Sequence, residues 1–319
     1  MSIQERVRLT TSCRDCDNIP KVEKAGVVSV ENNQKIQYMF NGIKIHYDCY
    51  HSPWMNQIIT DLKGHHEPQE ELCFHHVLNL LPEKANMIEL GCAWAYYSMW
   101  FNHAIPDSKN ICIEPNINKL HKGIANINLN NLDLNKFVLM NGYIGRNYVQ
   151  DSVFTDWDKT KMNIPQYSIE KIIKDNDNIF IDVLHSDIQG AEGDMLMGTV
   201  NVLNNIGFFV LSTHGDLHPK CMNFLVSNDF TILIQHTVEE SVSADGLIIA
   251  VNNKHIQKYE KNINTSINEY FDTNCHITKH SIIVGLQLVP RYYTYLISIL
   301  GLFLTQLCFY RLMVYLLIL

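Results

Sequence analysis

Residues 87–101, which read MIELGCAWAYYSMWF, limit the possible folds of this chain more than any other stretch. The first four residues form a short apolar run that stops at Gly91, which is typical of a buried parallel strand meeting a tight turn. Ala93 and Ala95 keep the turn small, so backbone N–H groups can approach a ligand, and residues 97–104 offer an apolar helical face. The stretch therefore predicts a strand, a small-residue turn and a helix that together form a nucleotide-type cradle.

The alternative is that this junction binds nothing, as in many α/β proteins. The stretch lacks the G-x-G-x-x-G pattern, because Ala93 and Tyr96 stand at the second and third glycine positions, and this disfavours a nicotinamide or flavin cofactor. A second apolar run, residues 110–114, ends in Glu114. Because a carboxylate at the tip of the second strand is where a ribose diol is held, the two runs together favour a ligand that contains ribose.

The composition excludes several classes of protein. At 319 residues with 46% hydrophobic content, the chain can bury a sizeable core, and one large domain is favoured over two small ones. A formal charge of -8, a pI near 6.0 and the lack of a Lys/Arg-rich block give no electrostatic footprint for nucleic acid. Nine cysteines without regular spacing fit a reducing compartment, and the first ten residues have no apolar secretory core. We therefore predict a cytoplasmic chain without a nucleic-acid partner.

The N-terminal residues contain half of a possible zinc site. Cys13 and Cys16 have the spacing of two zinc ligands, but no second C-x-x-C or H-x-x-H completes a tetrahedron. The adjacent pairs His65-His66 and His75-His76 point in divergent directions on a helix or a strand. We therefore predict no metal site, and interpret residues 1–63 as an N-terminal extension or lid.

The remaining pattern predicts a doubly wound α/β fold. Residues 28–46 alternate in polarity around two turn signals, which indicates antiparallel strands, and residues 64–71 form a polar turn before a helix that Pro82 ends. Residues 142–145 are expected to form a second close-approach turn, and residues 155–166 a polar insertion. Helices are expected at 117–129 and 167–174, and further strands at 136–141, 181–187, 208–214, 230–236 and 246–251. With the two strands above, this makes a mostly parallel seven-stranded sheet.

Polar residues gather where two of these strands end. His185 and Asp187 close the strand at 181–187, and His214 closes the next one. Because open α/β sheets bind their ligands at the carboxyl ends of the strands, we expect these side chains to lie in a site.

The tail differs from the rest of the chain. Residues 292–310 carry no charge and lie between Arg291 and Arg311. As a helix at ~1.5 Å per residue they would span roughly 28 Å, close to the ~30 Å hydrocarbon core of a bilayer. We expect a hydrophobic C-terminal helix over 286–319 that is a possible membrane anchor; the alternative is a helix docked on its own domain or on a partner.

Seven segments in this order resemble the FkbM-type methyltransferases, S-adenosylmethionine-dependent enzymes with a class I Rossmann-like fold. The segments cover about residues 12–252 and are residues 12–17 with 19–22, GHHEPQEE, ELGCAWAYYSMWF, CIEPN, HSDIQGAE, LSTHG and ADGLI. The resemblance implies that residues 64–285 form the methyltransferase domain, whereas the tail lies outside it.

The resemblance also implies where the cofactor would lie. Glu89 and the turn formed by Gly91, Ala93 and Ala95 would surround the methionine part of S-adenosylmethionine, and Glu114 would hydrogen-bond the ribose hydroxyls. The adenine would lie near Gly142 and Tyr143. Ala93 departs from the family pattern, in which a second glycine is common at this position.

Methyl transfer requires an aligned nucleophile and, for a hydroxyl acceptor, a proton acceptor. Asp187 is the first candidate for that base or for orienting the acceptor, followed by His214 and His185. We therefore expect O-methylation of a hydroxyl on a glycan or another secondary metabolite. The alternatives are an N- or C-methyltransferase, or a non-catalytic, membrane-tethered binding module of the same fold.

Overall fold

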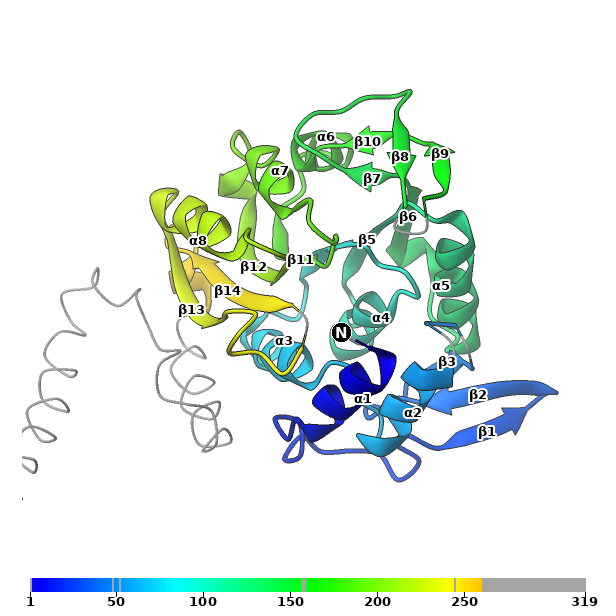
Figure 1. Cartoon of the computed structure of the whole chain (residues 1–319). Helices are drawn as coiled ribbons and strands as arrows, with labels where there is room; N and C mark the ends of the chain where they lie inside the picture. The colour runs from blue at the N-terminus through cyan, green and yellow to red at the C-terminus, as the bar shows by residue number, and fades with distance from the viewer. Residues whose placement is uncertain (1, 48, 52, 157–158, 244, 260–319) are drawn as a thin grey trace, which may run out of the picture. The chain divides into compact units, whose positions relative to one another are not determined.

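A seven-stranded sheet forms the centre of the computed structural model, which describes residues 2–47, 49–51, 53–156, 159–243 and 245–259. The strand order is β13-β14-β12-β11-β4-β5-β6 (Figure 1). The strands are β4 Asn86–Leu90, β5 Lys109–Glu114, β6 Phe137–Asn141, β11 Ile181–Ser186, β12 Ile206–Thr213, β13 Phe230–His236 and β14 Gly246–Asn252. Neighbouring strands from β6 to β12 are parallel, whereas β14 is antiparallel to both β12 and β13. The predicted doubly wound, mostly parallel seven-stranded sheet is confirmed.

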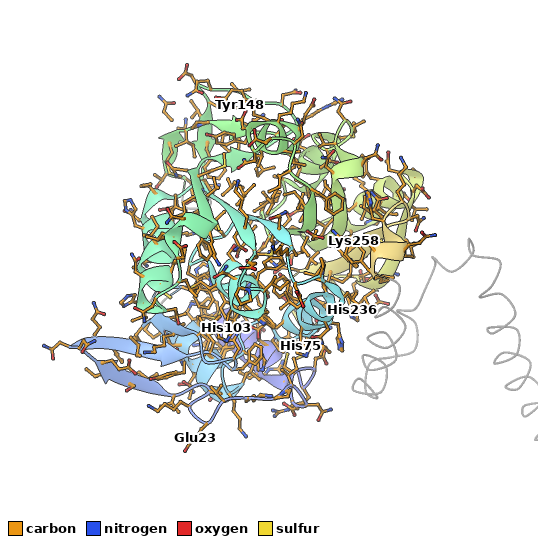
Figure 2. The ribbon with its side chains drawn as sticks, turned by 180° about the vertical axis from the view of Figure 1, so that it is seen from behind. Glu23, His75, His103, Tyr148, His236 and Lys258 are labelled. Atoms are coloured by element: carbon orange, nitrogen blue, oxygen red, sulfur yellow. The ribbon has the colours of Figure 1, made fainter. Side chains whose placement is uncertain are left out.

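Helices cover both faces of this sheet. Successive side chains of a strand point to opposite faces, so Met87 joins one buried cluster and Ile88 joins the other. The first cluster includes side chains of α3 Pro68–Leu80, α4 Tyr96–Ala104 and α5 Ile117–Leu129. The second includes side chains of α6 Ile169–Asp175, α7 Glu192–Met197 and α8 His218–Ser227. Side chains fill the layers between the sheet and its helices (Figure 2). Burial on both faces explains why the strands read as apolar runs.

The chain crosses from one half of the sheet to the other between β4 and β11. After β4 it runs outward through β5 and β6, and it then returns to add β11 and β12 on the other side of β4. This reversal is the switch point at which open α/β sheets bind ligands, and the predicted site residues follow the strands that meet there.

The N-terminal residues form their own small layer against the first buried cluster. The predicted antiparallel strands are confirmed as β1 Val28–Glu31, β2 Gln34–Tyr38 and β3 Lys44–His46. Two helices that we did not predict, α1 Ile3–Ser12 and α2 Pro53–Asp61, pack against each other. A capping box between Ser2 and Glu5 starts α1, and this S-x-x-E pattern was the available signal.

Three local predictions need correction. Helix α3 begins at Pro68 rather than after Glu71, so the acidic residues of the expected polar turn form its first helical turn. The expected turn at 142–145 contains the short strand β7 Tyr143–Ile144, which pairs in parallel with β10 Gln166–Tyr167. The expected insertion at 155–166 includes part of a hairpin of β8 Val153–Thr155 and β9 Lys161–Asn163. Tertiary pairing gives these short polar segments their strand geometry, because they have too few apolar residues to indicate it locally.

The predicted membrane helix at 292–310 lies outside the described residues, as does the boundary at residue 286. Within the described part of the chain, no helix has both the length and the apolar character needed to cross a membrane. The described residues belong to one compact unit, and its core already includes Cys16 and Ile19 from the expected extension. The division at residue 63 stays a prediction.

Candidate active site

The turn after β4 is shaped by the close approach of the loop after β11. Gly91 has a φ of +74°, and a β-carbon at this position would lie 2.1 Å from the carbonyl oxygen of Asp187. The Gly91 and Cys92 amides donate to the carbonyl of Ile113 at 2.9 and 3.0 Å. These two amides therefore join the turn to β5 instead of facing a ligand. The glycine is required because the two strand ends meet here.

Two alanines of this turn adopt an unusual backbone conformation. Ala93 has a φ of 43° and Ala95 a φ of 60°, both in the left-handed region that favours glycine. Ala95 is the N-cap of α4, and it supplies no side-chain cap. Strained residues of this kind persist where surrounding structure holds them, and they concentrate at functional sites.

Two buried carboxylates, Glu114 and Glu89, fix the turn through hydrogen bonds from backbone amides. Glu114 accepts hydrogen bonds from the amides of Ala93 at 3.0 Å and Asn116 at 2.8 Å, one on each oxygen. Glu89 accepts from the amide of Ser98 at 2.9 Å, in the first turn of α4. Burial raises the pKa of both carboxyl groups, although these amide donors oppose the shift. Glu114 therefore lies at the expected tip of the second strand, and it also fixes the turn.

The two residues expected near an adenine follow β6. The Gly142 amide donates to the carbonyl of Glu114 at 3.2 Å, and a β-carbon on Gly142 would lie 2.6 Å from the ring of Tyr167. Tyr143 packs its ring against Phe154 of the β8–β9 hairpin, with ring centroids 5.0 Å apart. The hairpin therefore covers this end of the candidate cofactor site.

His214, directly after β12, is surrounded by carboxylates from three different segments. Its Nδ1 lies 2.7 Å from Glu192 Oε1, and its Nε2 lies 3.1 Å from Asp245 Oδ1 and 3.4 Å from Asp187 Oδ1. The structure therefore brings together Asp187 and His214, two of the three residues that the sequence suggested for proton transfer. Gln189 also donates to Asp187, at 2.7 Å.

The charges in this cluster shift the pKa values in a way that suits proton transfer. Burial opposes a charge on His214, but its contacts with Asp245 and Glu192 raise the pKa of the imidazole to about 10. Burial and the nearby Glu67 and Glu70 raise the pKa of Asp187 to about 7. At neutral pH His214 is therefore a cation, and Asp187 is the group poised to exchange a proton.

His185 lies apart from this cluster. Its Nε2 is 2.7 Å from Glu70 Oε1, and its ring contacts that of Tyr97 with centroids 4.2 Å apart. Glu70 also accepts a hydrogen bond from Ser212, so it ties α3 to β11 and β12. His185 is buried, and its contacts place it against α3 and α4.

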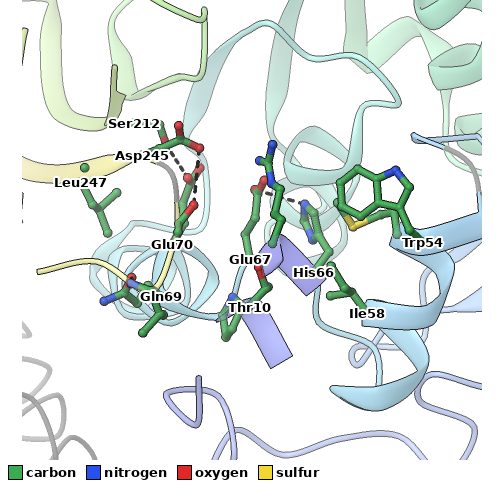
Figure 3. A pocket seen from close by; sticks show the side chains of 16 residues that line it. Thr10, Trp54, Ile58, His66, Glu67, Gln69, Glu70, Ser212, Asp245 and Leu247 are labelled. Carbon is green, nitrogen blue, oxygen red and sulfur yellow. Dashed lines mark hydrogen bonds and ion pairs between the residues drawn. The ribbon is translucent and has the colours of Figure 1, made fainter. Parts of the chain in front are cut away.

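A pocket opens beside these groups (Figure 3). Glu67, Glu70 and Asp245 line it together with apolar side chains such as Trp54 and Leu247. The remaining wall residues come from α1, α2, the turn before α3, the start of α3, the end of β12, and β14 with the segment that leads into it. The pocket therefore combines carboxylates with an aromatic wall, next to the His214 cluster.

A positive charge balances part of this acidity. His66 Nε2 lies 3.3 Å from Glu67 Oε2 in the pocket wall (Figure 3). Burial opposes the charge on His66, but Glu67 and Glu71 raise its pKa to about 10. Arg6 also lines the pocket. The pocket lining therefore carries charges of both signs, with three carboxylates and two cationic side chains.

No family model and no curated protein matches this chain. Several solved methyltransferases are similar in structure. TrmK from M. capricolum, in complex with S-adenosyl-homocysteine, is 12% identical over 63% of this chain and 97% of that chain, with a TM-score of 0.41. A precorrin-6y C5,15-methyltransferase from Geobacter metallireducens is 14% identical over 57% and 87%, with a TM-score of 0.39. An rRNA methylase from Streptococcus thermophilus is 8% identical over 57% and 94%, with a TM-score of 0.40. Identities and TM-scores this low carry no information about activity, which depends on the site residues of this chain.

Several charged residues of the site were not assigned roles from the sequence. Glu67, Glu70 and Asp245 belong to segments that the family resemblance includes, GHHEPQEE and ADGLI, but nothing in the local pattern shows where they point. One signal was available. Glu70 and Glu71 are adjacent acids directly before an apolar helical face, and both are buried in the structure. Buried carboxylates need partners, which predicts histidines or hydroxyls nearby.

Proposed function

We propose that this chain is an S-adenosylmethionine-dependent methyltransferase that methylates a hydroxyl of a glycan or another secondary metabolite. The observation that carries the proposal is the meeting of Asp187, His214 and Asp245 beside the pocket. Asp187 and His214 follow the carboxyl ends of β11 and β12, and Asp245 precedes the antiparallel β14. The seven-stranded sheet with its reversed β14 is a Rossmann-like methyltransferase fold. The FkbM-type segments described above support assignment to that family.

The residues present fit the cofactor that we propose. Each oxygen of Glu114 accepts one backbone hydrogen bond, which leaves it a lone pair for a ribose hydroxyl. Glu89, Gly91, Ala93 and Ala95 would hold the methionine part, with Gly142 and Tyr143 near the adenine. When bound, S-adenosylmethionine supplies an electrophilic methyl group.

The protein's own task is to orient the acceptor and remove its proton. Asp187 would accept the proton of the hydroxyl as the methyl group is transferred, since its raised pKa matches neutral pH. His214, fixed by Glu192, would keep the Asp187 carboxylate in place through their 3.4 Å contact. His185 is too closely engaged with Glu70 to compete for that role, and it would position α3 instead.

A second candidate function is methylation of an amine. The pocket carboxylates Glu67, Glu70 and Asp245 are suited to a cationic acceptor, because opposite charges attract strongly in a partly buried site. The Trp54 ring in the same wall already has the Arg6 guanidinium over it, 5.7 Å from the ring centroid, so the carboxylates would be the groups that receive the acceptor.

Two measurements test the proposal on the full chain. The first is calorimetric titration with S-adenosylmethionine and S-adenosylhomocysteine, for which we expect binding of both. The second is transfer of a labelled methyl group to pairs of acceptors that differ only in carrying a hydroxyl or an amine, such as a glycoside and its amino counterpart. Transfer to the hydroxyl alone supports the proposal, and transfer to the amine alone supports the second candidate.

The other outcomes argue against an enzyme of this type. Absence of cofactor binding would refute the methyltransferase assignment while leaving the fold unchanged. Binding without transfer to any acceptor of a broad panel would favour the non-catalytic binding module.

A further inference from the structure

Three residues from distant parts of the sequence form a buried cluster outside the candidate active site. Cys16 follows α1, His65 lies in the turn before α3, and Glu71 lies in the first turn of that helix. One ligand-type atom of each, a thiol sulfur, a ring nitrogen and a carboxylate oxygen, lies within 4.8 Å of the others. All three side chains are buried, with exposed fractions of 3%, 1% and 0%. The fold therefore supplies two partners to the half-site that Cys16 began in the sequence.

Polar atoms around this cluster lack partners. The Nδ1 atom of His65 is paired with Glu71 Oε2, whereas its Nε2 atom is buried and no hydrogen bond reaches it within the described residues. The hydroxyl of Tyr96 is also buried without a hydrogen bond within the described residues. The Tyr96 ring packs against that of His66, next to His65 in the chain, with ring centroids 5.2 Å apart. Buried polar groups without partners are costly, and a bound ion with a coordinated water is one common way to satisfy them.

The ligand types indicate the metal. Thiolate, imidazole and carboxylate together suit Zn²⁺, which is bound tetrahedrally, whereas Mg²⁺ and Ca²⁺ prefer oxygen ligands alone. Glu71 is already positioned by further bonds, since the amide of His66 donates to its Oε1 at 2.8 Å and that of Glu67 at 3.3 Å. Such second contacts orient metal-binding side chains.

We propose that Cys16, His65 and Glu71 bind a structural zinc ion, with a water or the carbonyl of Pro68 as the fourth ligand. The Cys16 thiol donates to that carbonyl at 3.0 Å. On binding, the sulfur would form a bond to zinc and release its proton to solvent, and the hydrogen bond to Pro68 would be lost. His65 would bind the ion as a neutral imidazole and Glu71 as a carboxylate, and the hydrogen bond between them would open to admit the ion.

The position of this site gives the ion a structural consequence. It would join the segment after α1 to the first turn of α3. The N-cap of this helix, Glu67, and Glu70 in its first turn line the active-site pocket. The zinc ion would therefore fix the pocket wall, without taking part in methyl transfer.

The test is zinc and cobalt binding by the full chain, stripped of metal with a chelator. We expect one zinc ion per chain after gel filtration, measured by elemental mass spectrometry. Cobalt should bind in its place and give the near-ultraviolet charge-transfer absorption of a cobalt–thiolate bond. Cys16→Ser should abolish this absorption and weaken zinc binding by more than about 100-fold.

The matched control is Cys73→Ser, which makes the same thiol-to-hydroxyl change at a buried cysteine of α3 outside the cluster. We expect it to bind zinc like the unchanged chain. Absence of stoichiometric zinc, or of the cobalt–thiolate absorption in the unchanged chain, would overturn the proposal whether or not the variants fold. Equal zinc affinity in Cys16→Ser would overturn it too. None of these readouts depends on methyl transfer.

Discussion

The cofactor side and the acceptor side of the candidate active site differ in how their carboxylates are held. On the cofactor side, Glu114 accepts its hydrogen bonds from backbone amides of the β4 turn and of Asn116. On the acceptor side, His214 meets Glu192, Asp187 and Asp245 through side chains alone. On the cofactor side, backbone amides hold the carboxylate. On the acceptor side, the contacts depend on the charge state of each side chain. Mutations should therefore affect binding and structure on one side, and turnover and pH dependence on the other.

Asp187→Asn should show the largest effect and separate the two sides. The substitution keeps the shape of the side chain but removes the proton acceptor, so we expect kcat to fall by about 10²–10⁴-fold. S-adenosylhomocysteine affinity should stay within about two-fold. Single-turnover methyl transfer and calorimetry measure the two quantities.

The same variant makes a stability prediction. Because folding raises the pKa of Asp187 from 3.8 to about 7, stability is lost as the pH rises from about 4 to 7, and the whole cost is present at pH 8. Asparagine cannot ionise, so urea unfolding at pH 8 should find the variant at least as stable as the unchanged chain. A variant that is less stable than the unchanged chain at pH 8 would contradict this stability prediction. Retained turnover, or lost cofactor binding, in Asp187→Asn would contradict the role of Asp187 as proton acceptor.

Gly91→Ala tests how tightly the cofactor turn is bound to the sheet. The new methyl group would collide with the Asp187 carbonyl at 2.1 Å, and the φ of +74° adds strain, so we expect a cost of about 3 kcal/mol in the free energy of unfolding. Gly190→Ala is the matched control, since its φ is +105° but nothing lies within 4 Å of the added methyl. It should cost only about 1 kcal/mol. Equal costs in urea titrations would show that the close approach has no energetic weight.

Glu114→Ala should weaken cofactor binding without the large fall in kcat that we expect for Asp187→Asn. The variant removes the acceptor of two backbone N–H groups and the proposed ribose ligand. We expect S-adenosylhomocysteine to bind about 30-fold more weakly, equivalent to about 2 kcal/mol. Calorimetry measures this change, with the exposed Glu83→Ala as control. Unchanged affinity would remove Glu114 from the cofactor site.

The smallest effect concerns pH, on the acceptor side. His214 has a folded-state pKa of about 10, above the unfolded value of about 6.5, so its stabilising contribution is complete below pH 6.5. The contribution is then lost as the pH rises toward 10. We expect stability to fall by ~1–2 kcal/mol between pH 6.5 and 9, less than the full shift implies because the ring is partly exposed. In His214→Gln this part of the slope should vanish; an identical profile by urea unfolding would rule out His214 as the cause.

The comparison also explains which residues could be found from the sequence. Gly91, Glu114 and the strands that carry them are specified by local patterns, namely an apolar run, a breaker and a helix that follows. The boundaries of α5, predicted at 117–129, agree with the structure. The pocket carboxylate Asp245 received no role, because its partner His214 lies far away in the sequence. Glu67 received none although His66 is its sequence neighbour, because the pattern does not show that both line a pocket. Helices α1 and α2 were missed because they are short, and α1 is mostly polar.

The sequence by itself determined the strands of the mostly parallel sheet and the strand ends at which Asp187 and His214 stand, because hydrophobic periodicity and breaking residues act over a few neighbouring positions. Only the tertiary structure decided which charges meet. It placed Asp245 and Glu192 against His214, Glu70 against His185, and Cys16 beside His65 and Glu71. Charge and coordination depend on distances of a few ångströms between groups that packing brings together, and no local sequence pattern encodes those distances.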